Sequence, residues 1–197
     1  AYEIVIDWSS DVCSSDLASG CVAILETART LKKLISENRL PAPRRSIRFL
    51  WPSEIEGSII YLAADPERAA NTKYNIHLDM VGGGPETKAT FRISTGPASV
   101  ANFGSDIAHA IGNFVNAQSQ DFADGKHPPY PLNAQEGGKE PQHAIYEAMN
   151  MGSDHQDFMQ VHGAYSDLLH DWPNRYIHTT GATAPRIGPT KLNRGDT

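Results

Sequence analysis

The chain has 197 residues, of which 40% are hydrophobic and 20% are charged, and its formal net charge is −6. This length supports one domain with a substantial core. The acidic balance argues against binding to nucleic acid or to an anionic membrane surface, because both require clustered basic residues. No apolar run approaches the roughly 20 residues that cross a bilayer. We therefore expect a globular domain with no nucleic-acid partner and no transmembrane segment.

Residues 1–17 differ in character from the rest of the chain. The blocks AYEI and DWSSDVCSSDL resemble the in-frame translation of a sequencing primer and adapter, in primer order. The stretch YEIVIDW also alternates like a strand, but the longer match outweighs this alternative. We predict that residues 1–17 are a sequencing artefact that makes few packed contacts or pairs only at a sheet edge. Residues 18–197 would then be a partial domain.

Leaving out residues 1–17 changes the charge and the cysteine content. The loss of four acidic residues moves the formal net charge from −6 to −2. Cys21 becomes the single cysteine, so a disulfide framework is excluded. Neither property identifies a cellular compartment.

Hydrophobic periodicity predicts helices and strands that alternate along the chain. The expected helices cover residues 19–38, 53–64 or 56–64, and 101–118, and the expected strands cover residues 46–51, 74–81, 88–94 and 161–169. Residues 121–142 are rich in glycine, proline and polar residues, which predicts a long loop. Another loop, over residues 172–189, precedes a C-terminal helix. This alternation predicts a three-layer α/β domain.

Two predicted strands end beside carboxylates. Glu54 lies in WPSEIEGS, where a strand passes into a helix, and α/β sheets place functional groups at the carboxyl ends of strands. Alternatively, Glu54 is an acid that favours a helix N-terminus. Asp79 lies in the apolar segment NIHLDMVG, where a carboxylate is costly unless it is ion-paired or bound to a metal. His77 shares a strand face with Asp79, and we expect it to be a structural histidine.

Two further segments carry polar groups in loops or turns. GSDHQDF contains Asp154 and His155, and DWPNRYIHTT contains His178. Each segment alone is a weak signal, because a loop histidine is usually only solvated. Acids and histidines dispersed over several loops nonetheless suit a zinc hydrolase, in which nitrogen and oxygen ligands hold the metal and a free carboxylate activates water.

These segments, in this order and spacing, resemble a known family. From Ala18 to about Leu192 the chain is similar to the di-zinc aminopeptidases of peptidase family M28, which include bacterial leucyl aminopeptidases and aminopeptidase Y. The resemblance is carried by ASGCVAILETARTL, RRSIRFLWPSEIEGS, NIHLDMVG, GSDHQDF, DWPNRYIHTT and IGPTKL. It implies a three-layer αβα fold with a mixed, mostly parallel sheet, incomplete at its N-terminal edge. Residues 18–197 would be a partial zinc-peptidase catalytic domain.

The resemblance also assigns roles to individual residues. Asp79 matches the aspartate ligand of one zinc ion, and His178 matches the histidine ligand of the other. Glu54 matches the general base, which takes a proton from metal-bound water as the water attacks a peptide carbonyl. Asp154 and His155 match a block that shapes the rim of the site. The implied activity is removal of N-terminal residues from a peptide substrate, with two zinc ions in the complete protein.

The chain departs from the family pattern at several positions. Ile55 follows Glu54 where many members have a second glutamate as metal ligand, so either Glu54 doubles as ligand or Glu56 has taken this place. Ile177 stands where members often have a tyrosine, and Ala182 where an aspartate is usual. These departures keep two alternatives open: a catalytically inactive aminopeptidase-like binding domain, or a related zinc enzyme such as a glutaminyl cyclase.

The family's His-x-Asp ligand block would precede residue 18 and is absent from the sequence. Asp16 occupies the register of the family's bridging aspartate, but we do not count it as a ligand because it lies in the adapter-like segment. Because a two-zinc site needs its full ligand set to hold the metals, we expect this chain by itself to be a poor enzyme.

Overall fold

The computed structural model describes residues 3–7, 14–100 and 102–195, with the side chains of residues 4–6, 19–100 and 102–195. Six strands form one sheet in the order β2-β1-β3-β6-β4-β5. The strands are β1 (Glu3–Asp7), β2 (Ser46–Phe49), β3 (Thr72–Asp79), β4 (Thr90–Ser94), β5 (Ile145–Glu147) and β6 (Tyr165–Trp172). The helices are α1 (Ser14–Ser36), α2 (Glu56–Ala64), α3 (Pro66–Asn71), α4 (Phe103–Ala123), α5 (His155–His162) and α6 (Pro189–Gly195), with short 3-10 turns η1 (Pro85–Thr87) and η2 (Ala184–Arg186).

The sheet is mixed and mostly parallel, as predicted. β1 pairs in parallel with β2 and β3, and β3 pairs in parallel with β6. β4 runs antiparallel to β6 and parallel to β5. The carboxyl ends of β1, β2, β3 and β6 therefore lie along one side of the sheet, which we call the carboxyl edge.

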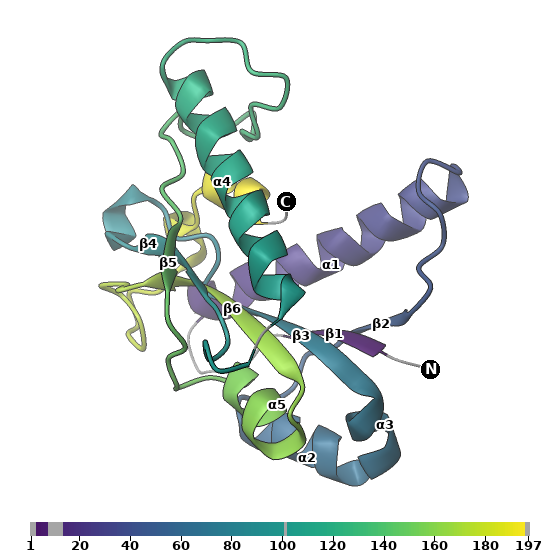
Figure 1. The fold of residues 1–197 in the computed structure, drawn as a ribbon. Coiled ribbons are helices and arrows are strands. Elements are labelled where there is room, and N and C mark those ends of the chain that lie inside the picture. The colour runs from purple at the N-terminus through teal and green to yellow at the C-terminus, as the bar shows by residue number, and fades with distance from the viewer. Residues whose placement is uncertain (1–2, 8–13, 101, 196–197) are drawn as a thin grey trace.

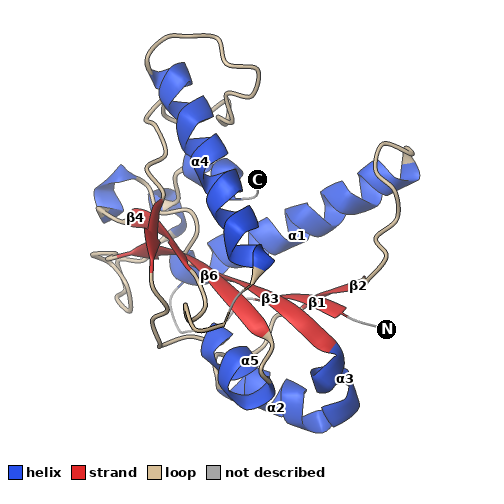
Figure 2. Cartoon of the chain, in the orientation of Figure 1, coloured by secondary structure: helices blue, strands red, loops and turns tan. Residues whose placement is uncertain are grey.

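Helices cover both faces of the sheet and make three layers (Figure 1). α1 and α4 stand on one face, and α2, α3 and α5 lie on the other (Figure 2). The core on the first face contains Ile24, Leu78 and Phe91. The core on the second face includes Leu62 and Phe158. The predicted three-layer α/β fold is confirmed.

Local sequence explains where several helices begin and end. The Asp65 carboxylate caps α3 by accepting a hydrogen bond of 2.9 Å from Arg68 N, which satisfies one of the unpaired amides at a helix N-terminus. Asn102 caps α4 in the same way through Gly104 N. α5 ends at Gly163, whose φ of 64° lies in the left-handed region that glycine adopts at low cost. This break explains why β6 begins at Tyr165 rather than at the predicted residue 161.

β1 corrects the expectation for the N-terminal segment. β1 is an inner strand, paired on both sides, and Val5 is 0% exposed and Ile6 9% exposed. The prediction that residues 1–17 make few packed contacts, or pair only at a sheet edge, is therefore wrong for residues 3–7. The physical reason is that consecutive apolar residues suit a strand that is buried on both faces. The adapter-like origin stays a prediction, and residues 8–13 lie outside the described part.

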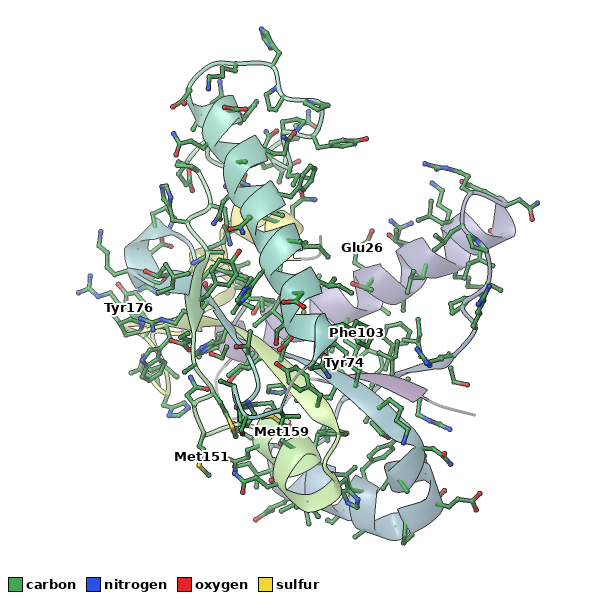
Figure 3. The ribbon with its side chains drawn as sticks, viewed as in Figure 1. Glu26, Tyr74, Phe103, Met151, Met159 and Tyr176 are labelled. Atoms are coloured by element: carbon green, nitrogen blue, oxygen red, sulfur yellow. The ribbon has the colours of Figure 1, made fainter. Side chains whose placement is uncertain are left out.

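An apolar cavity of about 440 Å³ lies between the sheet and α4. Ile76 and Leu78 of β3 and Ile107 of α4 are among the residues that line it. Phe103, at the start of α4, lies close to Tyr74 (Figure 3). It also lines the cavity and is 67% exposed. The first face of the sheet is thus incompletely covered. Among the described residues, no helix combines the length and the apolarity needed to cross a bilayer.

Candidate active site

The topology brings the predicted site residues to the carboxyl edge. Glu54 follows β2, Asp79 is the last residue of β3, and His178 lies in the turn that follows β6. Because β2, β3 and β6 point the same way through β1, their following segments all emerge at this edge. This is the side of an open α/β sheet on which ligands bind.

Glu54 stands at a tight turn before α2. Glu56 N donates a hydrogen bond of 2.6 Å to Glu54 O, and the residue between them, Ile55, has φ 58° and ψ −62°. Such a three-residue turn with positive φ is rare and strained, above all for a β-branched residue. A Cβ on Gly57 would lie 2.9 Å from Pro52 Cβ, so only glycine fits there. Glu56 itself is exposed at the start of α2.

The GSDH segment holds this turn from the other side. Ser153 Oγ donates a hydrogen bond of 3.2 Å to Glu54 Oε1. The buried carboxylate of Asp154 accepts a hydrogen bond from Ile55 N through Oδ1. Glu54, Ser153 and Asp154 therefore form one connected group, although the first lies far from the other two in the chain.

Two buried histidines lie behind this group. His77 Nε2 is 2.8 Å from Ser153 Oγ, and the His77 ring stacks on that of His155 with centroids 6.1 Å apart. His155 Nε2 lies 3.0 Å from Asn150 O. His77 is buried and hydrogen-bonded, as predicted for a structural histidine. The sequence does not predict its contact with Ser153. The one feature that places His77 near the site is that it shares a strand face with Asp79.

Asp79 is half-buried and borders a second polar cluster. In the sheet it pairs with His170 of β6, whose Nε2 lies 2.9 Å from Glu147 Oε1. Arg92 Nη1 donates to Glu147 Oε2 at 2.5 Å, and Ser94 donates to Oε1. Partial burial raises the pKa of Glu147, but the hydrogen bonds from these neighbours outweigh it and hold this pKa at about 2. No local sequence pattern indicates this cluster, because its members lie on three separate strands.

The glycines after Asp79 are fixed by Asp171. Gly83 N donates a hydrogen bond of 2.6 Å to Asp171 Oδ2, and Lys191 Nζ lies 2.6 Å from Oδ1 of the same carboxylate. A Cβ on Gly83 would lie 2.8 Å from Thr87 Oγ1. These contacts therefore fix the backbone conformation of the glycine segment that follows Asp79.

The side chains at the carboxyl edge are of the types that bind zinc, but the described side chains do not form a metal-binding group. Glu54, Asp79 and His178 offer the oxygen and nitrogen atoms that zinc binds. Within the described part of the chain, however, no three His, Cys, Asp or Glu side chains come together in a group that could hold a metal. His178 is exposed in its turn, whereas Asp79 is half-buried in the sheet. Their convergence on one centre, and their ligand roles, remain predictions, and the Asp16 side chain lies outside the description.

The comparison with protein families decides the relationship. The profile of Peptidase family M28 matches residues 10–195. The chain belongs to this family. None of the curated proteins compared with the chain matches it significantly.

Solved structures share the fold of this M28 chain at low identity. An aminopeptidase from Aneurinibacillus sp. strain AM-1 superposes with a TM-score of 0.66 at 23% identity, over 99% of this chain and 41% of that one. A zinc aminopeptidase from Bacillus subtilis gives 0.62 at 20% identity, over 99% and 44%. A glutaminyl cyclase from Macrostomum lignano gives 0.65 at 14% identity, over 99% and 65%. The chain thus spans less than half of the length of these two aminopeptidases.

Proposed function

We propose that this M28 chain belongs to a zinc-dependent exopeptidase that removes N-terminal residues from peptides. The observation that supports this most is the placement of Glu54: a carboxylate at the carboxyl edge, on a strained turn, with one oxygen held by Ser153 at 3.2 Å. A general base must present its carboxylate in a fixed direction. Backbone strain of this kind costs on the order of 1–3 kcal/mol and is found most often at functional sites.

Glu54 is the general base in this proposal. Its Oε1 is engaged by Ser153, so Oε2 receives the proton from the attacking water and passes it to the leaving amine. Glu56, the alternative to Glu54 as the glutamate metal ligand, has an exposed side chain at the start of α2. Asp154 and His155, predicted at the rim of the site, are both buried, and Asp154 contacts the turn that follows Glu54.

Asp79 and His178 would each provide one ligand of a two-zinc site in the complete protein. Zinc, when bound, supplies Lewis-acid polarisation of a carbonyl oxygen and makes water more acidic. His178 has a φ of 56° in an exposed turn, a conformation that histidine tolerates better than most residues. This exposure leaves the imidazole accessible to a metal and to a peptide.

A glutaminyl cyclase is the second candidate. It is favoured by the extent of the structural match, because the chain covers 65% of the Macrostomum lignano enzyme and 70% of a Porphyromonas gingivalis glutaminyl cyclase. Both reactions need a carboxylate that moves a proton near a metal, so the described residues serve either. Fold alone does not separate them.

The test combines metal content with a substrate panel. Purified chain is titrated with zinc, and bound metal is measured for the wild type, Asp79→Ala and His178→Ala. Because the His-x-Asp block is absent from the sequence, the proposal predicts weak zinc binding that both substitutions weaken further, whereas Glu54→Gln keeps this binding and loses the residual turnover. Hydrolysis of leucine-p-nitroanilide, compared with cyclisation of N-terminal glutaminyl peptides, separates the two enzymes. Zinc binding that neither substitution weakens would contradict the ligand roles of Asp79 and His178.

A further inference from the structure

The turn that carries Glu54 is not stable by its own chemistry. Ile55 at its centre has φ 58° and ψ −62°, which a β-branched residue adopts only under external constraint. The 2.6 Å hydrogen bond between Glu56 N and Glu54 O closes the turn from within. A second contact must hold Ile55 in place, since a strained conformation persists only when its surroundings fix it.

Asp154 supplies that contact. Its carboxylate accepts a hydrogen bond from Ile55 N, and the side chain is 0% exposed. A hydrogen bond from a backbone amide to a carboxylate is about twice as strong as one between neutral groups. The bond joins residues 99 positions apart in sequence. It therefore anchors the strained turn to the segment that begins α5.

Ser153 acts on the Glu54 side chain itself. A hydroxyl has one proton, and Ser153 donates it to Glu54 Oε1, so in the 2.8 Å contact with His77 Nε2 the Ser153 oxygen accepts the hydrogen bond. This assigns the Nε2 proton of His77 and gives the relay His77–Ser153–Glu54 a single direction. His77 is buried in the central strand β3, so the relay begins at a rigid point of the sheet.

We propose that Ser153 and Asp154 are positioning residues that together set the direction of the Glu54 carboxylate, Asp154 through the backbone and Ser153, backed by His77, through the side chain. The identity of Glu54 as the base rests on the proposed function. The two restraints themselves are independent of it. Neither residue touches substrate in this scheme; both act through Glu54.

Amide hydrogen exchange at Ile55 tests the backbone restraint. In the full chain, Asp154→Ala should speed exchange of the Ile55 amide about tenfold or more, because the charged acceptor is lost. Asp154→Asn keeps an acceptor oxygen and should restore much of the protection. Asp65→Ala is the matched control: it removes a carboxylate that accepts from a backbone amide, that of Arg68, and should speed exchange there but not at Ile55. Exchange at Ile55 within twofold of wild type in Asp154→Ala would overturn the restraint.

Nitrogen chemical shifts of His77 test the side-chain restraint. The wild type should show the proton on Nε2, and Ser153→Ala should shift the Nε2 resonance while the Ile55 amide stays protected. Ser153→Thr, which keeps the hydroxyl, should restore the wild-type shift. An unprotonated Nε2, or a resonance that does not move in Ser153→Ala, would overturn the relay. This variant also gives a test if Asp154→Ala does not fold.

Kinetics separate this inference from the proposed function. If Glu54 is the base, Ser153→Ala and Asp154→Ala lower kcat and leave KM near its wild-type value, and the Thr and Asn variants recover part of kcat. If Glu54→Gln leaves turnover unchanged while both restraints are observed by NMR, the proposed role of Glu54 fails and the restraints stand. If Glu54→Gln removes turnover but the two alanine variants keep kcat, the positioning role fails.

Discussion

Residues with positive φ occur at or next to three of the predicted site residues. Among the described residues, six that are not glycine have positive φ, and three of them are Ile55, Met80 and His178. Ile55 directly follows Glu54, Met80 directly follows Asp79, and His178 is itself a predicted ligand. Positive φ in Ile55 and Met80 costs free energy that the rest of the fold must offset, and the cost is smaller for histidine, which tolerates this conformation better than most residues. Its recurrence at three separate segments of the carboxyl edge supports a functional site there.

The strain at Ile55 predicts an unusual response to glycine. Both Ile55→Gly and Ile59→Gly should lower the free energy of unfolding. The loss in Ile55→Gly should be smaller than the loss in Ile59→Gly by roughly 1 kcal/mol. Glycine relieves the positive φ at Ile55, whereas in α2, where Ile59 is 43% exposed, it adds the usual helix penalty. Urea denaturation of both variants measures the difference. An equal or larger loss at Ile55 would show that the turn is not strained.

Sequence patterns point to single candidate residues but not to the contacts between them. Glu54 and Asp79 were found because each stands where an apolar strand pattern ends. The contact between Ser153 and Glu54 spans 99 residues, and no local pattern encodes such a distance. The signal that was present, the polar GSDH segment, placed Asp154 and His155 at the rim of the site. Both are buried, and Asp154 accepts a hydrogen bond from Ile55 N in the turn that follows Glu54.

At the scale of elements, periodicity predicted the longer helices and most strands but not the short ones. β5 has three residues and α3 has six, too few for a period to appear. β3 ends at Asp79, before the predicted residue 81, because Met80 turns away with φ 55°. The residues of β1 alternate like a strand in the sequence, but they also resemble a translated adapter. β1 is an inner strand because it pairs with β2 on one side and β3 on the other. The sequence does not show these long-range pairings.

The inner position of β1 predicts a clear difference between two valines. Val5 in β1 is 0% exposed and Val22 on α1 is 49% exposed. Val5→Ala should lower the free energy of unfolding by about 2 kcal/mol, because it removes buried methyl groups and leaves a cavity. Val22→Ala should change it by no more than about 0.5 kcal/mol. Chemical denaturation measures both, and similar values would mean that β1 does not hold its place in the sheet.

Glu147 on β5 should make the protein less stable in acid. Its pKa is lowered from 4.5 to about 2, so the folded state favours the carboxylate. The resulting stabilisation is present above the unfolded pKa and is lost as pH falls from about 4.5 towards 2. Thermal unfolding across this range should therefore show a smaller pH dependence in Glu147→Gln than in the wild type.

Glu26→Gln is the control for this pH dependence. Glu26 also accepts hydrogen bonds from an arginine, but its pair with Arg29 is on the surface of α1. Exposed ion pairs contribute little to stability. The slope of melting temperature against pH should be nearly the same in Glu26→Gln and the wild type. An unchanged slope in Glu147→Gln would show that the β4–β5–β6 cluster does not couple to folding.

At the scale of the whole molecule, the two faces of the sheet are covered unequally. The helices α2, α3 and α5 close over one face, whereas α1 and α4 diverge above the other (Figure 1). The cavity of about 440 Å³ lies on this more open side. Phe103, Ile107 and Ile111, spaced one helical turn apart, line it and are 67%, 50% and 43% exposed. Contiguous apolar surface of this kind marks a site of association.

The open face predicts self-association of the 197-residue chain. The apparent mass measured by light scattering should rise with concentration, because pairing of the α4 faces buries apolar side chains. Phe103→Ser combined with Ile107→Ser should move the chain towards the monomer and reduce binding of an apolar dye. Ile60→Ser is the matched control: Ile60 on α2 is 67% exposed, like Phe103, but does not line the cavity. If Ile60→Ser restored the monomer equally well, general stickiness rather than the α4 face would be the cause.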